Sequence, residues 1–209
     1  MSQILHVEGL RFAYPGQPPL VAGWSARVGA GVTLLHGDTG SGKSTLLRVL
    51  AGVLPAGGRL TLAGARLDAA PDAYRRNVFF CDPATDKFDE MTVHACTAAL
   101  RADDPPFDEA LWRALVEGFA LLPHIDKRLY MLSTGSRRKV YLAAALASGR
   151  ALTLLDDPAG ALDAASIRCL WRTLADFAAS QHPGRAILVA SSETIDAVPL
   201  ATTIGLPPC

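Results

Sequence analysis

The feature that most constrains this chain is an octet, Gly-Asp-Thr-Gly-Ser-Gly-Lys-Ser, at residues 37–44. It fits the pattern G-x-x-x-x-G-K-[ST], in which glycines let backbone N–H groups turn inward around an anion. The apolar stretch 32–35 before the octet reads as a buried strand, and residues 45–50 after it carry apolar side chains at helical spacing. A strand, a glycine loop and a helix in this order predict a phosphate-binding P-loop, because N–H donors and the positive end of the helix dipole meet there.

Individual roles within this loop follow from its chemistry. We expect Lys43 to reach the β- and γ-phosphates of a nucleotide and the Ser44 hydroxyl to reach Mg²⁺. The loop therefore predicts a nucleotide and Mg²⁺ as ligands, and by itself leaves kinases, GTPases, helicases and transport ATPases open. The loop residues that we expect to surround the phosphates are Gly37, Asp38, Thr39, Gly40, Ser41, Gly42, Lys43, Ser44 and Thr45.

Composition narrows the class of protein. With 209 residues, 50% of them hydrophobic, the chain suits one compact domain with a sizeable core. Its formal net charge is zero and no basic run exceeds residues 137–139, so we expect no nucleic-acid partner. The N-terminus does not resemble a signal peptide and no stretch is long enough to span a membrane, so any membrane role must come through a partner. The cysteines lack metal-ligand spacing, which favours a reducing, cytoplasmic compartment; they are Cys81, Cys96, Cys169 and Cys209.

Strand and helix signals alternate along the chain. Short apolar runs and turn residues over 1–35 predict a small antiparallel sheet at the N-terminus. Residues 90–148 turn helical and read as an inserted helical subdomain. Further strands are predicted at 59–62, 77–80, 151–155 and 186–190, and a helix that Asp163 caps is predicted between the last two. The fold class is therefore α/β: a P-loop NTPase within one domain, 1–209, with a mostly parallel sheet core, an N-terminal antiparallel β subdomain and an inserted helical subdomain at about 90–148.

A second motif narrows the kind of NTPase. Residues 152–157 read Leu-Thr-Leu-Leu-Asp-Asp, a mostly apolar strand that ends in acids, which is the Walker B arrangement. A buried strand can place Asp156 beside the P-loop, where its carboxylate would hold Mg²⁺ or a Mg²⁺-bound water.

A third segment, Leu-Ser-Thr-Gly-Ser at 132–136, precedes an alanine-rich helix. It resembles the LSGGQ signature of the ATP-binding cassette (ABC) ATPases, and the resemblance covers nearly the whole chain, including a D-loop-like Gly-Ala-Leu-Asp at 160–163. It implies that Ser133 and Gly135 bind the γ-phosphate of ATP held by an opposite subunit. It also implies that Tyr14, in Phe-Ala-Tyr-Pro-Gly, stacks on adenine.

Several positions depart from the family pattern. The resemblance implies Asp157 as general base, where the family usually has Glu, and Ser192 in place of the switch His that contacts the γ-phosphate. Together with Lys43 these form the expected catalytic set. Cys81 stands at the Q-loop Gln, and its sulfur is a poor Mg²⁺ ligand. Thr134 and Ser136 replace a Gly and a Gln of the signature, so we expect nucleotide binding with attenuated hydrolysis.

Two functions of different classes follow from the resemblance. The first is the ATPase subunit of an ABC transporter, in which two cassettes, as a homodimer or a heterodimer, sandwich ATP and drive a transmembrane permease from the cytoplasmic face of the cell membrane. The second is a nucleotide-gated, largely non-hydrolysing module for dimerisation or regulation. A third, a soluble ABC protein of DNA repair or translation, is disfavoured because the chain lacks long coiled coils, a second cassette and basic patches.

Overall fold

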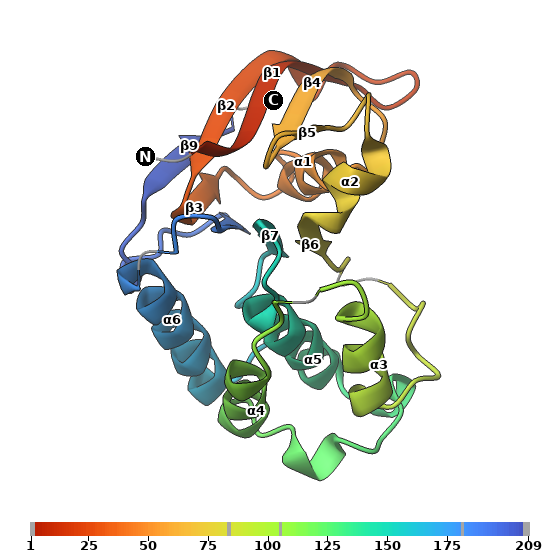
Figure 1. The fold of residues 1–209 in the computed structure, drawn as a ribbon, viewed down its shortest axis with the longest axis vertical. Coiled ribbons are helices and arrows are strands. Elements are labelled where there is room, and N and C mark those ends of the chain that lie inside the picture. The colour runs from red at the N-terminus through yellow and green to blue at the C-terminus, as the bar shows by residue number, and fades with distance from the viewer. Residues whose placement is uncertain (1–2, 83–84, 105, 181, 207–209) are drawn as a thin grey trace.

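Two sheets and a set of helices make up the fold in the computed structural model, which describes residues 3–82, 85–104, 106–180 and 182–206 (Figure 1). The smaller sheet is antiparallel, with strands in the order β2-β1-β4-β5. Its strands are β1 (Gln3–Phe12), β2 (Val21–Gly29), β4 (Gly57–Leu62) and β5 (Ala65–Arg66). The predicted antiparallel subdomain is thus confirmed, but residues 31–36, which the 1–35 pattern had grouped with it, belong to the second sheet.

The larger sheet is parallel throughout, with strands in the order β6-β7-β8-β3-β9. Its strands are β3 (Gly31–His36), β6 (Val78–Phe80), β7 (Leu152–Asp156), β8 (Ala186–Ser191) and β9 (Thr202–Gly205). Because parallel strands end at the same edge, the loops that follow β3, β7 and β8 meet there.

Both faces of the parallel sheet are buried, and each lies in a different hydrophobic core. Leu35 of β3 packs with helix α1 and the antiparallel sheet, whereas Val32 and Leu34 pack with the helices on the opposite face. Strands β3, β7 and β8 therefore read as mostly apolar runs, as parallel strands covered on both sides do. The helices are α1 (Lys43–Leu50), α2 (Pro71–Arg76), α3 (Val93–Leu100), α4 (Glu109–Gly118), α5 (Thr134–Ala147) and α6 (Ala164–Ala179).

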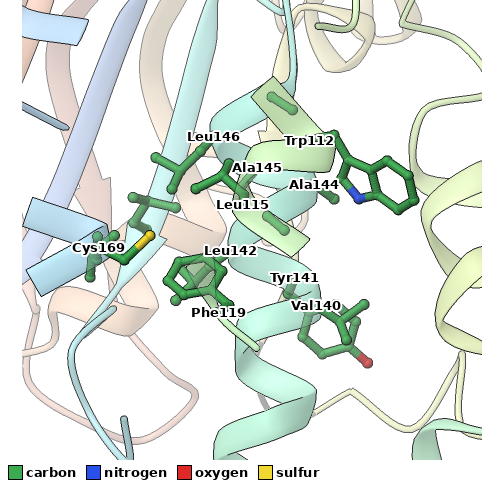
Figure 2. Close-up of a cluster of buried hydrophobic side chains, with 14 of the residues drawn as sticks. Trp112, Leu115, Phe119, Val140, Tyr141, Leu142, Ala144, Ala145, Leu146 and Cys169 are labelled. Carbon is green, nitrogen blue, oxygen red and sulfur yellow. The ribbon is translucent and has the colours of Figure 1, made fainter. Parts of the chain in front are cut away.

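The helical core gathers around α5, whose residues from Val140 to Ala147 are all buried. Figure 2 shows Trp112, Leu115 and Phe119 beside α5, with Cys169 of α6 close by. Short alanines on α5 let α3 and α4 approach it closely, while α6 packs against α4 and β3 (Figure 1). This cluster spans the region that the sequence predicts as a helical subdomain.

The elements in which the structure differs from the sequence predictions are short. Within the stretch predicted to be helical, α4 ends at Gly118: Ala120 takes a left-handed backbone with φ 54°, and Leu122–His124 forms a separate 3-10 turn. Helix α2 and strand β9 have no clear periodicity in the sequence. Among the described residues, no helix is long and apolar enough to cross a membrane, and Cys209 lies outside them.

Candidate functional site

The P-loop, Asp157 and Ser192 meet at the carboxyl edge of the parallel sheet. His36 at the end of β3 lies opposite Ser191 of β8, so Gly37 and Ser192 begin adjacent loops. Asp156 at the end of β7 lies opposite Ala190, and the Asp157 N–H donates to the Ala190 carbonyl at 2.9 Å. The sheet register therefore brings together residues that are more than a hundred positions apart in the chain.

The P-loop connects β3 to α1 by a tight path. Gly40 and Gly42 both adopt left-handed backbones, with φ of 84° and 88°, which glycine takes without a Cβ clash. Gly42 is the N-cap of α1, and a Cβ there would lie 2.0 Å from the Leu20 side chain. The octet thus has the backbone shape that aims the N–H groups of a helix N-terminus at an anion.

The side chain of Lys43 folds back over the P-loop. Its ammonium donates to the carbonyl oxygens of Gly37 and Asp38, each at 2.7 Å. An ammonium carries three donors, so these two contacts leave one donor for a phosphate oxygen. Lys43 can therefore hold the loop and bind a phosphate from the same position.

Tyr14 reaches the P-loop helix from the antiparallel sheet. Its hydroxyl is 3.1 Å from the Thr45 hydroxyl, and its ring stands edge-on to Phe12 with centroids 5.1 Å apart. The residue is 39% exposed, so part of Tyr14 is accessible beside α1. This placement suits the expected stacking on adenine.

Ser44 and Asp156 line one cleft of about 490 Å³, which lies within the range of small-molecule sites. The other residues that line the cleft are Arg48, Asp82, Thr134, Arg137 and Arg138. A hydroxyl and a carboxylate are hard oxygen ligands of the kind that Mg²⁺ uses together with phosphate oxygens and waters. No cluster of three His, Cys, Asp or Glu side chains that could hold a metal occurs within the described residues. The donor set therefore fits Mg²⁺ that arrives with a nucleotide, not a self-contained protein cage.

The pKa of Asp156 is raised above its ordinary value, chiefly because burial disfavours the charged carboxylate. A hydrogen bond from Ser44 opposes this shift, the neighbouring Asp157 charge adds to it, and Arg138 and Arg48 lower it. A buried carboxylate beside a hydroxyl and two cations is well placed for a divalent ion, whose charge would restore the ionised form.

Asp157 follows with a left-handed backbone, φ 41°, a conformation that Asp tolerates better than most residues. Its carboxylate lies over Gly160, where a Cβ would be 2.4 Å from Oδ2. Ala161 is also left-handed, with φ 60°. The expected general base thus sits on a tight turn that leads into the D-loop-like segment.

Ser192 and Cys81, two further positions that depart from the family pattern, lie in different environments. Ser192 is exposed, in the loop just after β8. Cys81, just after β6, lines a small cavity with Tyr141, Arg138 and Asp156. Burial raises the pKa of the Cys81 thiol to about 12, so it stays neutral and offers no charge to a metal.

The signature segment forms the N-terminus of α5. Ser133 is its N-cap and accepts the Ser136 N–H at 3.1 Å. Gly135 packs against the D-loop-like turn, since a Cβ there would lie 2.4 Å from the Ala161 carbonyl oxygen. Ser133 is exposed and so can meet a group from another molecule.

Charged residues of the cleft were missed by the sequence reasoning. Arg48 of α1 forms an ion pair with Asp82 at 2.8 Å, and Arg138 of α5 donates to the Gly160 carbonyl at 2.5 Å. The only sequence signal for Arg138 is the basic run 137–139 directly after the signature, and this run does not indicate which of its side chains enters the cleft.

Comparisons with known proteins place the chain among relatives of one kind. The sequence model of the family described as "ABC transporter" matches residues 25–160. The taurine import ATP-binding protein TauB of Pseudomonas entomophila (strain L48) is 32% identical over 207 residues, 97% of this chain and 78% of that protein. The cytochrome c biogenesis ATP-binding export protein CcmA of Rhodospirillum rubrum is 35% identical over 199 residues, 91% of this chain and 81% of that protein. A solved structure of a putative ABC transporter ATP-binding protein from Pyrococcus furiosus shares the fold, with a TM-score of 0.77, 20% identity and 98% of each chain covered.

Proposed function

Because this chain belongs to the ABC transporter family, we propose that it binds ATP with Mg²⁺ and hydrolyses it slowly to drive a transmembrane permease. It is an ATP-binding subunit of the kind that the import and export relatives represent. The observation that carries the proposal is that Ser44 and Asp156 line the same cleft, beside a P-loop whose carbonyl oxygens accept hydrogen bonds from Lys43.

Each residue of the nucleotide site would have its own role in binding or hydrolysis. Lys43 and the loop N–H groups would bind the triphosphate, and Tyr14 would stack on the base. Ser44 and Asp156 would hold Mg²⁺, which neutralises phosphate charge when it is bound. Asp157 would accept the proton of the attacking water.

A second cassette and a permease would complete the transporter. Ser133 at the exposed N-terminus of α5 is supported as a donor to a γ-phosphate held by a partner cassette, because its hydroxyl stands where a helix dipole favours anions. As an ATP-binding subunit that acts on a permease, the chain would lie at the cytoplasmic face of the cell membrane, peripherally bound through that permease.

Slow hydrolysis is proposed from three positions. Asp157 is one methylene shorter than Glu, and displacing a base by about one ångström can cost roughly 10²-fold in rate. Ser192 offers one hydrogen bond and no charge where an imidazole would reach further. Cys81 is neutral and half-buried, so it contributes little to a phosphate or a metal.

The same three positions favour the alternative, a nucleotide-gated module that dimerises with little turnover. The two functions share the ATP site and differ in hydrolysis. Phosphate release therefore separates them.

The test is phosphate release at saturating Mg²⁺-ATP by wild type, Asp157→Asn and the double variant Asp157→Glu with Ser192→His. We expect wild type to turn over below the roughly 1–10³ s⁻¹ of typical enzymes. Asp157→Asn should abolish the activity, and the double variant should exceed wild type because it lengthens the base and restores a γ-phosphate donor. Asp126→Glu adds a methylene at an exposed site away from the cleft and should match wild type.

Three outcomes would decide against parts of the proposal. An ordinary wild-type rate, or a double variant no faster than wild type, would show that the departures are harmless. Equal, negligible release by wild type and Asp157→Asn, with ATP binding intact, would favour the non-hydrolysing module.

A further inference from the structure

The three side chains of the basic run 137–139 each contact a different part of the protein. Arg137 forms an ion pair with Asp89 at 3.0 Å, and Lys139 forms one with Asp163 at 2.5 Å. Arg138, half-buried between them, turns toward the Walker B strand and donates through Nη1 to the Gly160 carbonyl at 2.5 Å. Of the three, Arg138 is therefore the one directed at the turn that carries Asp157.

Gly160 shows how close Arg138 comes to the expected base. A Cβ at Gly160 would lie 2.4 Å from Arg138 Nη1 and 2.4 Å from Asp157 Oδ2. Since both atoms lie 2.4 Å from one point, they are no more than 4.8 Å apart. At this distance a guanidinium and a carboxylate attract each other, more strongly in a half-buried site than in water.

The turn itself needs to be held in place. Asp157 and Ala161 both have left-handed backbones, with φ of 41° and 60°, and the Gly160 N–H closes the turn on the Asp157 carbonyl at 3.1 Å. Left-handed L-residues persist only where the surroundings impose them. Arg138 reaches this turn from α5, a different element, and so ties the signature helix to the loop that carries the base.

We propose that Arg138 is a positioning residue for ATP hydrolysis, which orients the Asp157 carboxylate by binding the Gly160 carbonyl and by attracting the carboxylate itself. This inference rests on the proposed role of Asp157 as general base. The same side chain lines the cleft with Ser44 and Asp156, so the link joins the signature helix, the base and the Mg²⁺ ligands of one subunit.

The experiment compares Arg138→Gln and Arg138→Lys with wild type in single-turnover and steady-state phosphate release, with the Kd for Mg²⁺-ATP measured by calorimetry. We expect Arg138→Gln to lower kcat at least about tenfold, the scale of a partly displaced base, with KM and Kd unchanged. Arg138→Lys keeps a cation and a donor and should retain most of the activity. Arg168→Gln, on the exposed side of α6, is the matched control and should behave as wild type.

A double-mutant cycle tests whether Arg138 acts through Asp157. Arg138→Gln is repeated in the Asp157→Glu background, where the longer carboxylate has a different distance to the guanidinium. A coupled pair should change the fold-loss by at least about threefold between the two backgrounds. Equal losses in both would overturn the inference, as would an unchanged kcat in Arg138→Gln or a loss confined to KM.

Failure of the proposed function would look different. If wild type and Asp157→Glu bind Mg²⁺-ATP but release no phosphate in single turnover, hydrolysis itself is refuted and the positioning role falls with it. If wild type hydrolyses and the cycle is additive, hydrolysis stands and the role of Arg138 alone is refuted.

Discussion

At the scale of single residues, Lys43 shows how a charge is held ready for a ligand. Its ammonium bridges two carbonyls of its own loop at 2.7 Å, so the P-loop is shaped before any phosphate arrives. Less side-chain entropy is then lost on binding.

Lys43→Ala should therefore weaken Mg²⁺-ATP binding at least about tenfold, because the triphosphate charge loses a charge-assisted hydrogen bond and the loop loses its clamp. Calorimetric titration measures the effect. Lys127→Ala, an exposed lysine outside the cleft, is the control. Equal affinity in the Lys43 variant and wild type would contradict the P-loop assignment.

We expect Asp156, as the proposed Mg²⁺ ligand, to make Mg²⁺ binding sensitive to pH. Burial raises the pKa of its carboxyl, so it takes up a proton at a higher pH than an exposed Asp would. Mg²⁺ needs the ionised form, and a proton and the ion therefore compete for the same oxygen.

We expect the Mg²⁺-dependent gain in ATP affinity to fall in wild type as the pH is lowered, and to fall at a higher pH than it would with an exposed Asp as ligand. The measurement is ATP affinity with and without Mg²⁺ at each pH. Asp156→Asn serves as reference, because protonation of ATP itself affects both proteins equally. A wild-type gain that tracks the Asn variant at every pH would rule out Asp156 as a ligand.

At the scale of elements, the signature helix and the D-loop-like turn are packed together within one subunit. Gly135 at the start of α5 touches the Ala161 carbonyl, and Lys139 one turn later pairs with Asp163, the N-cap of α6. The backbone contact leaves no room for a side chain at Gly135. Movement of one element would therefore carry the other with it.

Gly135→Ala should impair phosphate release by roughly tenfold or more, since a Cβ would displace the helix N-terminus or the turn and a small misplacement has a large kinetic cost. Binding of Mg²⁺-ATP to the P-loop should stay unchanged. Gly184→Ala is the matched control, because a Cβ there meets nothing within 4 Å. A Gly135 variant with wild-type turnover would show that this contact is dispensable.

At the scale of the whole molecule, the parallel sheet separates two cores. One joins α1 to the antiparallel sheet and the other joins the sheet to α4, α5 and α6. The P-loop joins the parallel sheet to α1 of the first core, whereas Ser133 caps α5 on the helical side and is exposed. The chain can thus hold ATP on one part and offer a γ-phosphate donor from another.

We expect the protein to be monomeric without nucleotide and to form a dimer, alone or on its permease, with Mg²⁺-ATP. The reason is that the γ-phosphate of ATP bound to one copy would be the anion that the signature segment of the second copy binds. Asp157→Asn should keep this dimer for longer, since hydrolysis would dissolve it. Light scattering with and without ATP reports the mass. One unchanged mass in every condition, permease included, would refute the sandwich.

The sequence by itself determined the class of fold and the motifs from which the candidate site is built. The octet at 37–44, the apolar strand ending in Asp156 and the Ser-Thr-Gly of the signature are local patterns, because loop shape, strand burial and helix capping depend on neighbours in the chain. The cap at Asp163 and the helical stretch around α5 were predictable for the same reason.

Only the tertiary structure decided what these motifs touch. The short elements α2 and β9 carry too few residues for a period to emerge, and Arg138 looks like any surface arginine until the fold sets Gly160 against it. Its partner is set by the packing of α5 against the parallel sheet, a long-range contact that no local pattern encodes. The positions of the base, the turn and the guanidinium therefore depend on how two elements pack, while the identity of the phosphate loop is written in eight consecutive residues.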